Sequence, residues 1–218
     1  FTVSGPNIRF GLVAVKGVGR GLIRALVEER ERGGRFTSFQ DFCERMYDSD
    51  LNRRALENLI RCGAFDTMGV RRSQLVAVFG QVLDGIAASR KKNLEGQFDL
   101  FGGGGDAHPA EIVFPNLPEF TAHELMSMEK ETTGLYLTGH PMDEYREEVR
   151  RSGSVSIGGI LNDFSQEDGP ERYHDEQRVK VAGMIEGVKT KTTRNNSLMA
   201  YVTLEDDSGM MELLVFSR

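Results

Sequence analysis

The stretch Val15-Lys16-Gly17-Val18-Gly19-Arg20-Gly21 decides how the N-terminal part of this 218-residue chain is interpreted. It lies between a short apolar segment and a helical pattern, in which apolar residues recur at helical spacing. Two glycines around an apolar residue allow a tight turn and a close approach of the backbone to a ligand. Amides at the start of the following helix then point outward, where the helix dipole favours an anion.

Lys16 and Arg20 add positive charge beside these amides, so the stretch predicts the hairpin of a helix-hairpin-helix motif. Such a hairpin binds DNA phosphates without reading bases. The candidate DNA-binding residues are Lys16, Gly17, Val18, Gly19, Arg20 and Gly21. The alternative is a plain turn between packed helices, since one Gly-x-Gly pattern is weak evidence. Ile23 stands where the motif usually has a small residue, four positions after the second glycine.

Residues 59–66 form a degenerate second copy with the single glycine Gly63, from which we expect a weaker hold on phosphate. Arg71 and Arg72 begin the next helical pattern and are further candidates for contact with a DNA backbone. These two arginines, with Arg53 and Arg54, could equally form a solvated face.

The sequence around both hairpins predicts an all-helical domain over residues 1–92. Ser38 and Asn52 are typical N-caps of two helices, and Gly63 is a typical helix end. A longer helix follows, because apolar residues repeat at intervals of three and four between residues 75 and 86.

The stretch Gln97-Phe98-Asp99-Leu100-Phe101 stands between glycines in residues 93–120, which otherwise have the composition of a linker. Two aromatic residues and a leucine in a linker indicate a binding surface. The string matches the bacterial sliding-clamp-binding peptide, in which a Leu-Phe pair fills an apolar pocket. The alternative is that Leu100 and Phe101 fold back onto the helical domain.

Residues 121–177 are interpreted as a helical connector followed by an acidic segment. Thr121 and Glu124 have the spacing of a capping box, which predicts a helix to about Thr133. Pro141 suits the first position of a short helix, and residues 163–177 are polar and acidic.

Apolar residues recur with a period of two in residues 178–218, which predicts a block of antiparallel strands. Strands are expected over 178–185, 198–205 and 210–216, with a turn at 207–209. The block resembles the start of an OB-fold, a barrel that holds single-stranded nucleic acid. Candidate contacts to such a strand are Lys189, Lys191, Arg194 and Tyr201. Three strands cannot close a five-stranded barrel and unpaired edges are sticky, so we expect this block to be partly disordered or paired with another chain. The whole chain is thus predicted as α+β.

The net charge of −6 hides three blocks of different sign. Residues 1–92 hold 16 lysines and arginines against 10 acidic residues, residues 93–177 hold 5 against 18, and residues 178–218 hold 6 against 5. Such blocks indicate parts with different partners, and the first suits phosphate contact.

Several functional classes are disfavoured by composition. Cys43 and Cys62 cannot build a disulfide scaffold and fit a reducing cytoplasm. No run approaches the roughly 18 apolar residues of a membrane span, so we expect no membrane partner. His140 is interpreted as a turn residue, and no catalytic constellation or metal-ligand spacing stands out. Phe1 is not an initiator methionine and opens no signal peptide, which predicts a piece of a longer cytoplasmic protein.

Together, these motifs resemble the alpha subunits of bacterial DNA polymerase III and occur in that family's order. The stretches that carry the resemblance are residues 8–12, 16–19, 42–45, 59–66, 129–131, 134–141 and 202–206. The resemblance implies a non-catalytic segment of a DNA-directed DNA polymerase, with no cofactor of its own and Mg²⁺ at a polymerase site encoded upstream. Its implied partners are duplex DNA, the sliding clamp, single-stranded DNA and other replisome subunits. Alternatives are a fragment of a DNA-repair enzyme, which also uses these modules, and a structural domain without DNA contact.

Overall fold

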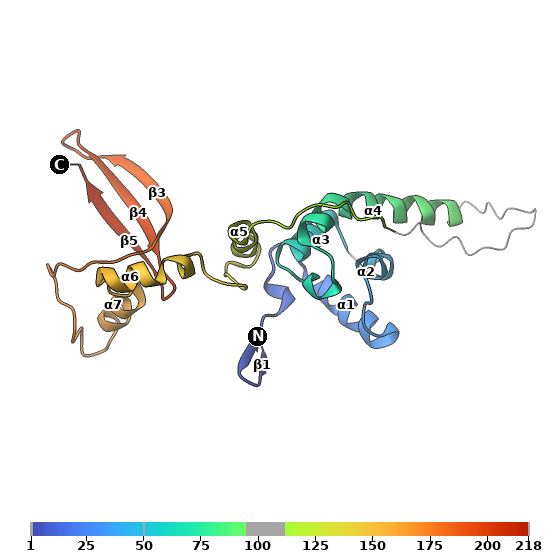
Figure 1. Cartoon of the computed structure of the whole chain (residues 1–218), viewed down its shortest axis with the longest axis horizontal. Coiled ribbons are helices and arrows are strands. Elements are labelled where there is room, and N and C mark those ends of the chain that lie inside the picture. The colour runs from blue at the N-terminus through green and yellow to red at the C-terminus, as the bar shows by residue number, and fades with distance from the viewer. Residues whose placement is uncertain (1, 50, 95–111, 218) are drawn as a thin grey trace, which may run out of the picture. The chain divides into compact units, whose positions relative to one another are not determined.

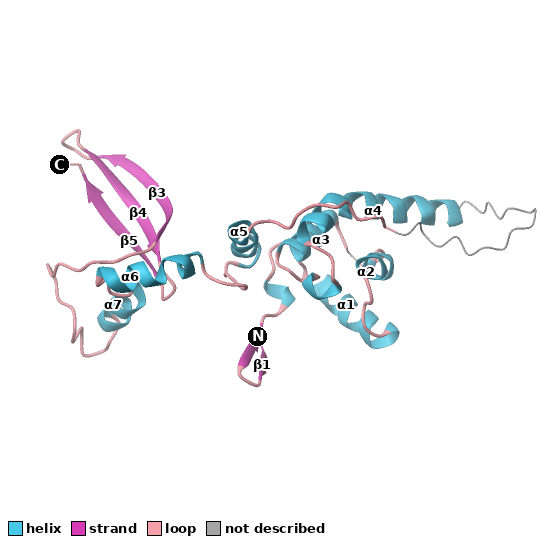
Figure 2. Ribbon diagram, viewed as in Figure 1, coloured by secondary structure: helices cyan, strands magenta, loops and turns pink. Residues whose placement is uncertain are grey.

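This computed structural model describes residues 2–49, 51–94 and 112–217. Contacts divide the chain into two units, Phe1–Leu137 and Thr138–Arg218, which are described separately (Figure 1). The first unit is helical apart from one small hairpin, whereas the second combines a sheet with short helices (Figure 2). The α+β class is therefore confirmed. The division at residue 137 falls inside the segment 121–177 that the sequence suggested as a connector.

The described residues of the first unit form a two-stranded hairpin, two 3₁₀ turns and five α-helices. Its elements are β1 (Thr2–Ser4), β2 (Asn7–Arg9), η1 (Leu12–Ala14), α1 (Arg20–Gly33), α2 (Phe39–Met46), α3 (Arg53–Arg61), η2 (Asp66–Met68), α4 (Arg72–Leu94) and α5 (Ala122–Thr133). Three predicted caps are confirmed. The Ser38 side chain accepts a hydrogen bond from the Asp41 amide, and that of Asn52 accepts one from the Ala55 amide. Thr121 and Glu124 form a complete capping box at α5.

The core of the first unit is a layer of apolar side chains between these helices. Its fully buried members include Leu56, Leu59 and Ile60, which share one face of α3. Phe42 makes edge-on contacts with Phe36 and with Phe65, with ring centroids 5.1 and 4.9 Å apart. Each such pair contributes about 0.5–1.5 kcal/mol beyond the area it buries. Phe65 thus fixes the turn after α3 to the core.

Residues 112–120 form neither helix nor strand, yet they lie against the helical unit. Ile112 and Phe114 pack on its core. The backbone carbonyl of Pro115 accepts a hydrogen bond from Gln74 at 2.8 Å, and that of Leu117 accepts one from Arg71 at 2.7 Å. This stretch, here called the strap (residues 112–120), connects to α5, which returns to α3.

The second unit contains a three-stranded antiparallel sheet in the order β3-β4-β5 and short helices at one end of it (Figure 1). Its elements are η3 (Pro141–Tyr145), α6 (Arg146–Ser152), α7 (Ile157–Phe164), β3 (Met184–Thr192), β4 (Leu198–Glu205) and β5 (Met210–Phe216). The predicted bounds of β4 and β5 are confirmed. The bounds predicted for the first strand are wrong, because residues 178–183 precede β3. Val181 forms an isolated parallel bridge with Val155, and the Lys180 carbonyl accepts from the Val155 amide at 2.8 Å.

Helix α7 was not predicted from the sequence, because two glycines in its first turn lower its helix propensity. Tertiary capping compensates. The Ile157 amide donates to Asp206 at 2.8 Å, and the Gly158 amide donates to the Ser208 hydroxyl at 2.8 Å. The predicted turn after β4 is therefore also the cap of a helix.

Candidate nucleic-acid interface

The first hairpin is a tight turn held by one backbone hydrogen bond, from the Val18 amide to the Val15 carbonyl at 3.1 Å. Gly17 occupies the third position with φ of 76°, which non-glycine residues rarely adopt. Val15 and Val18 point into the core, whereas Lys16, Gly17, Gly19, Arg20 and Gly21 are exposed. The turn thus anchors itself by its two valines and presents its glycine backbone to solvent.

The N-terminus of α1 is left uncapped by any side chain in the described part of the chain. Its N-cap is Gly19, which is extended and has no side chain with which to accept a hydrogen bond. The next helices differ, since α2, α3 and α5 each carry a side-chain cap. The first amides of α1 are therefore free donors at the positive end of a helix of 14 residues, which suits a phosphate oxygen.

Two other helices hold the backbone of Lys16. Its amide donates to the Thr132 carbonyl at the end of α5 at 2.8 Å. Its carbonyl accepts from the Asn58 side chain of α3 at 2.5 Å. Both main-chain groups of one exposed turn residue are thus satisfied by elements 42 or more residues away in sequence.

Four exposed cations lie in or close to the hairpin along the chain or in space: Lys16 and Arg20 in the hairpin itself, Arg24 one turn further along α1, and Arg54 of α3 beside Gly17. Among the described residues, none of the four forms an ion pair. A Cβ placed on Gly17 would lie 3.6 Å from both Cγ and Nε of Arg54, so this side chain lies across the glycine turn. Neighbouring Arg53 instead pairs with Asp84.

Arg54 was not predicted from the sequence to be part of this site. Its spacing of four from Asn58 places both on one face of α3, but nothing in the sequence shows which turn that face meets.

The second hairpin is built differently, and Arg72 corrects the sequence prediction. Its guanidinium is buried, donating to Asp66 at 2.6 Å, to Glu129 at 2.9 Å and to the Arg61 carbonyl at 3.1 Å. Burial alone would lower its pKa, but the hydrogen bonds to Asp66 and Glu129 outweigh it and raise the pKa. Arg72 is thus a structural cation and does not reach a DNA backbone.

Gly63, the glycine of this second hairpin, makes room for Arg72. It has φ of 80°, and a Cβ there would lie 2.3 Å from an Arg72 guanidinium nitrogen. The nearby amides of Gly63 and Ala64 bond to carbonyls of α3.

The start of α4 is closed by Glu119 of the strap. Its carboxylate accepts from the Arg72 amide at 2.8 Å and from the Ser73 amide at 3.0 Å. Burial would raise the pKa of Glu119, but the hydrogen bonds from the Ser73, Phe120 and Arg72 amides outweigh it and lower the pKa. A carboxylate thus fills the anion position of α4, and Arg71 is exposed beside it.

The other predicted binding residues fall into two groups. Gln97, Phe98, Asp99, Leu100 and Phe101 lie outside the described residues. In the sheet of the second unit, Lys189 pairs with Tyr201 and Lys191 with Met199. Side chains alternate along a strand, so both lysines share a face with Tyr201. Arg194 is exposed in the turn between β3 and β4.

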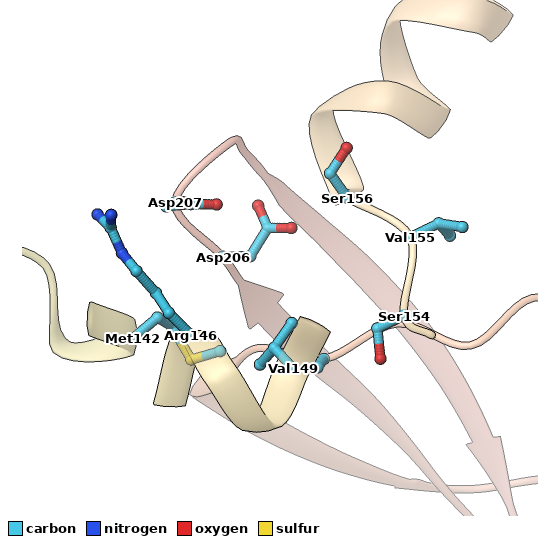
Figure 3. Close-up of a pocket in the computed structure, with 9 residues that line it drawn as sticks. Met142, Arg146, Val149, Ser154, Val155, Ser156, Asp206 and Asp207 are labelled. Carbon is cyan, nitrogen blue, oxygen red and sulfur yellow. The ribbon is translucent and has the colours of Figure 1, made fainter. Parts of the chain in front are cut away.

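The second unit also contains a small pocket of about 130 Å³, lined by Met142, Arg146, Val149, Ser154, Val155, Ser156, Ala182, Asp206 and Asp207 (Figure 3). Its buried carboxylate, Asp206, accepts hydrogen bonds from the Ile157, Ser208 and Gly209 amides and from the Ser208 hydroxyl. Asp206 thus holds the start of α7 and the turn after β4 in place.

No metal or reactive-thiol chemistry is evident in the described part of the chain. It contains no group of three His, Cys, Asp or Glu residues placed to hold a metal ion. Burial raises the pKa of Cys43 to about 12 and that of Cys62 to about 11, so both thiols stay protonated at neutral pH. No described helix has the length and apolarity of a membrane span.

Comparison with known proteins identifies the relatives of this chain. A family model described as "Helix-hairpin-helix motif" matches residues 1–75. The chain is 38% identical over 221 residues to DNA polymerase III subunit alpha of Thermus aquaticus, a match that covers 100% of this chain and 17% of that protein. It is homologous to a segment of DNA polymerase III alpha subunits.

Two further alpha subunits agree with this assignment. That of Deinococcus radiodurans is 36% identical over 221 residues, covering 100% of this chain and 16% of the relative. That of Escherichia coli (strain K12) is 34% identical over 216 residues, covering 97% of this chain and 18% of the relative. The chain therefore spans less than a fifth of the length of these alpha subunits. Because the matches cover all or nearly all of this chain, they favour the DNA polymerase III family over a DNA-repair enzyme.

Proposed function

We propose that this chain is the part of a replicative DNA polymerase that holds duplex DNA by its backbone and tethers the enzyme to a sliding clamp in the bacterial cytoplasm. The proposal of duplex binding rests on the hairpin of residues 15–21. It joins uncapped helix amides to four unpaired cations, and it lies inside the region matched by the helix-hairpin-helix motif.

The mechanism follows from the chemistry of the hairpin. Exposed amides of Arg20 and Gly21 donate to phosphate oxygens, while Lys16, Arg20 and Arg54 neutralise the neighbouring phosphates. None of these groups addresses base edges, so binding is independent of sequence. A polymerase must bind every sequence that it copies, and contacts to the DNA phosphate backbone allow this.

A double substitution, Lys16→Ala with Arg20→Ala, tests the duplex grip. We expect at least a tenfold loss of duplex affinity in fluorescence anisotropy, together with a smaller salt dependence, because two phosphate contacts are removed. Arg30→Ala is the matched control, since Arg30 is an exposed arginine in the last turn of the same helix. Equal affinity of the double variant and this control would contradict the proposed grip.

The clamp tether rests on the sequence Gln97-Phe98-Asp99-Leu100-Phe101. Linking a DNA grip to a ring around the same duplex raises the effective concentration of each contact, so two weak contacts give a long residence time. The strap and α4 fix both ends of the segment that carries this peptide to the same helical unit.

Calorimetric titration with a purified bacterial sliding clamp tests the tether. Leu100→Ala with Phe101→Ala should abolish the heat of binding, because the apolar pair supplies the buried anchor, and should leave duplex affinity unchanged. Undiminished clamp binding by this variant would place the contact elsewhere.

Contact of the sheet of the second unit with single-stranded DNA belongs to the same proposal. It is supported by the shared face of Lys189, Lys191 and Tyr201, where an aromatic ring can stack on a base beside two cations.

A further inference from the structure

We propose that α5 is a positioning element of the DNA-binding hairpin, and that buried Glu129 is the residue through which it acts. This inference rests on the proposed duplex grip of residues 15–21 and adds a part to it. A chain of buried contacts connects α4 to α5 and α5 to the hairpin.

The first link is the carboxylate of Glu129, whose side chain is fully buried. One oxygen accepts from the Arg72 guanidinium of α4 at 2.9 Å, and the other accepts from the Leu137 amide at 2.8 Å. Each oxygen thus ties α5 to a different segment, one before the strap and one after the helix. A buried carboxylate is stable only while such partners remain, so Glu129 fixes the position of its helix strongly.

The second link is Thr132, one turn further along α5. Thr132 is buried, and its carbonyl accepts from the Lys16 amide at 2.8 Å. Its hydroxyl donates to the Met128 carbonyl at 2.7 Å, which keeps it in the helical register set by Glu129. The two peptide groups that flank Lys16 are therefore oriented by α5 on one side and by Asn58 on the other.

This orientation matters because Lys16 and Gly17 aim the exposed amides of the turn. Without the bond to Thr132, the turn would keep the bonds from Val18 to Val15 and from Asn58 to the Lys16 carbonyl, but its Lys16 amide would be unheld. A phosphate bound by several amides and side chains requires them to converge within a few tenths of an ångström. The bond to Thr132 fixes the turn in advance, so DNA binding does not have to order it.

Hydrogen exchange in the 218-residue protein without DNA tests the link between Glu129 and the hairpin. Glu129→Gln replaces one accepting oxygen with a donor, so either Arg72 or Leu137 loses its partner while the size of the side chain is kept. We expect the Lys16 amide to exchange at least tenfold faster, with core amides of α3 unchanged. Glu131→Gln is the matched control, because Glu131 is on the same helix and pairs with Arg61 at the surface. Unchanged protection of the Lys16 amide in Glu129→Gln would overturn the proposal.

A pair of substitutions at Lys16 tests the consequence for DNA. Lys16→Ala removes the charge and keeps the amide, whereas Lys16→Pro removes both. Proline suits the second position of this turn, and Val15 has the extended backbone (φ −72°, ψ 127°) that a following proline requires. Lys16→Pro should therefore bind duplex about tenfold more weakly than Lys16→Ala, with the same salt dependence, because the two lose the same charge. Equal affinities of the two variants would overturn the positioning role.

The outcomes separate this inference from the proposed function. If Lys16→Ala with Arg20→Ala leaves duplex binding intact, the duplex grip itself fails, whatever exchange shows. If that variant loses binding while Lys16→Pro matches Lys16→Ala, the grip stands and the role of α5 is overturned.

Discussion

At the scale of the residue, the two hairpins use glycine for different purposes. Gly17 leaves its backbone exposed beside Arg54, whereas Gly63 makes space for the buried guanidinium of Arg72. The first hairpin thus leaves its backbone exposed, whereas the second is filled by the protein's own cation.

Substitution of Gly63 by alanine should be much more destabilising than the same change at Gly69. Both glycines have positive φ, 80° and 75°, so both variants carry backbone strain of about 1 kcal/mol. Only Gly63→Ala also places a methyl group against Arg72, which adds about 1–3 kcal/mol. Urea unfolding measures the difference. Equal free energies of unfolding for the two variants would show that Arg72 moves aside at no cost.

Asp163 holds the acidic loop that follows α7. Its oxygens accept from the amides of Glu171, Arg172 and Tyr173. Burial would raise the pKa of Asp163, but the amide hydrogen bonds from Tyr173, Arg172 and Glu171 outweigh it and lower the pKa. A lowered folded pKa means that the stabilisation is full above the unfolded value of about 3.9 and is lost as the pH falls through the folded value.

Hydrogen exchange of the Arg172 and Tyr173 amides should therefore accelerate as the pH falls below about 4, after correction for the intrinsic rate. In Asp163→Asn the protection should already be low at neutral pH and should not change with pH. Asp168→Asn, an exposed position in the same loop, serves as the control. Protection of these amides that does not change with pH in the unmodified chain would contradict this role.

At the scale of the element, the sequence predicted the features that depend on residues close together in the chain, namely helix caps and the bounds of two strands. Caps at Ser38, Asn52 and Thr121 were correct because capping uses residues three apart. The bounds of β4 and β5 were correct because alternation and a turn define a hairpin.

Elements and roles that depend on distant partners could not be predicted. Helix α7 depends on caps from Asp206 and Ser208, about 50 residues away in sequence. Arg72 was predicted to be a DNA contact because an arginine at a helix start is usually exposed, and its partner Glu129 lies 57 residues away. The sequence indicates that Lys16 belongs to the hairpin, but its bond to Thr132 of α5, 116 residues further along the chain, could not be predicted.

Helix α3 contributes to the proposed grip through Arg54, and the adjacent arginine provides a matched comparison. Arg54→Ala should weaken duplex binding about threefold to tenfold, because an unpaired cation beside the turn is removed. Arg53→Ala should have little effect, because Arg53 already pairs with Asp84. Anisotropy titrations at one fixed salt concentration compare the two. A larger loss for Arg53→Ala would place the DNA on another face of α3.

At the scale of the whole molecule, the charge distribution explains how a chain of net charge −6 can bind a polyanion. The basic residues concentrate in residues 1–92, and the unpaired ones described above gather at a single turn. The acidic residues concentrate in residues 93–177, which carry the predicted clamp peptide. In the proposed function, the first unit would therefore supply the DNA contact, while the clamp contact would come from a segment with little attraction to DNA.

The salt dependence of duplex binding by the 218-residue chain tests the central claim most directly. Fluorescence anisotropy with labelled duplexes of two unrelated sequences, from 50 to 200 mM salt, should give equal affinities that fall steeply. A slope of about −3 to −4 in the log–log plot is expected for the four cations at the hairpin. No binding at 50 mM salt, or a strong preference for one of the two duplex sequences, would contradict the account.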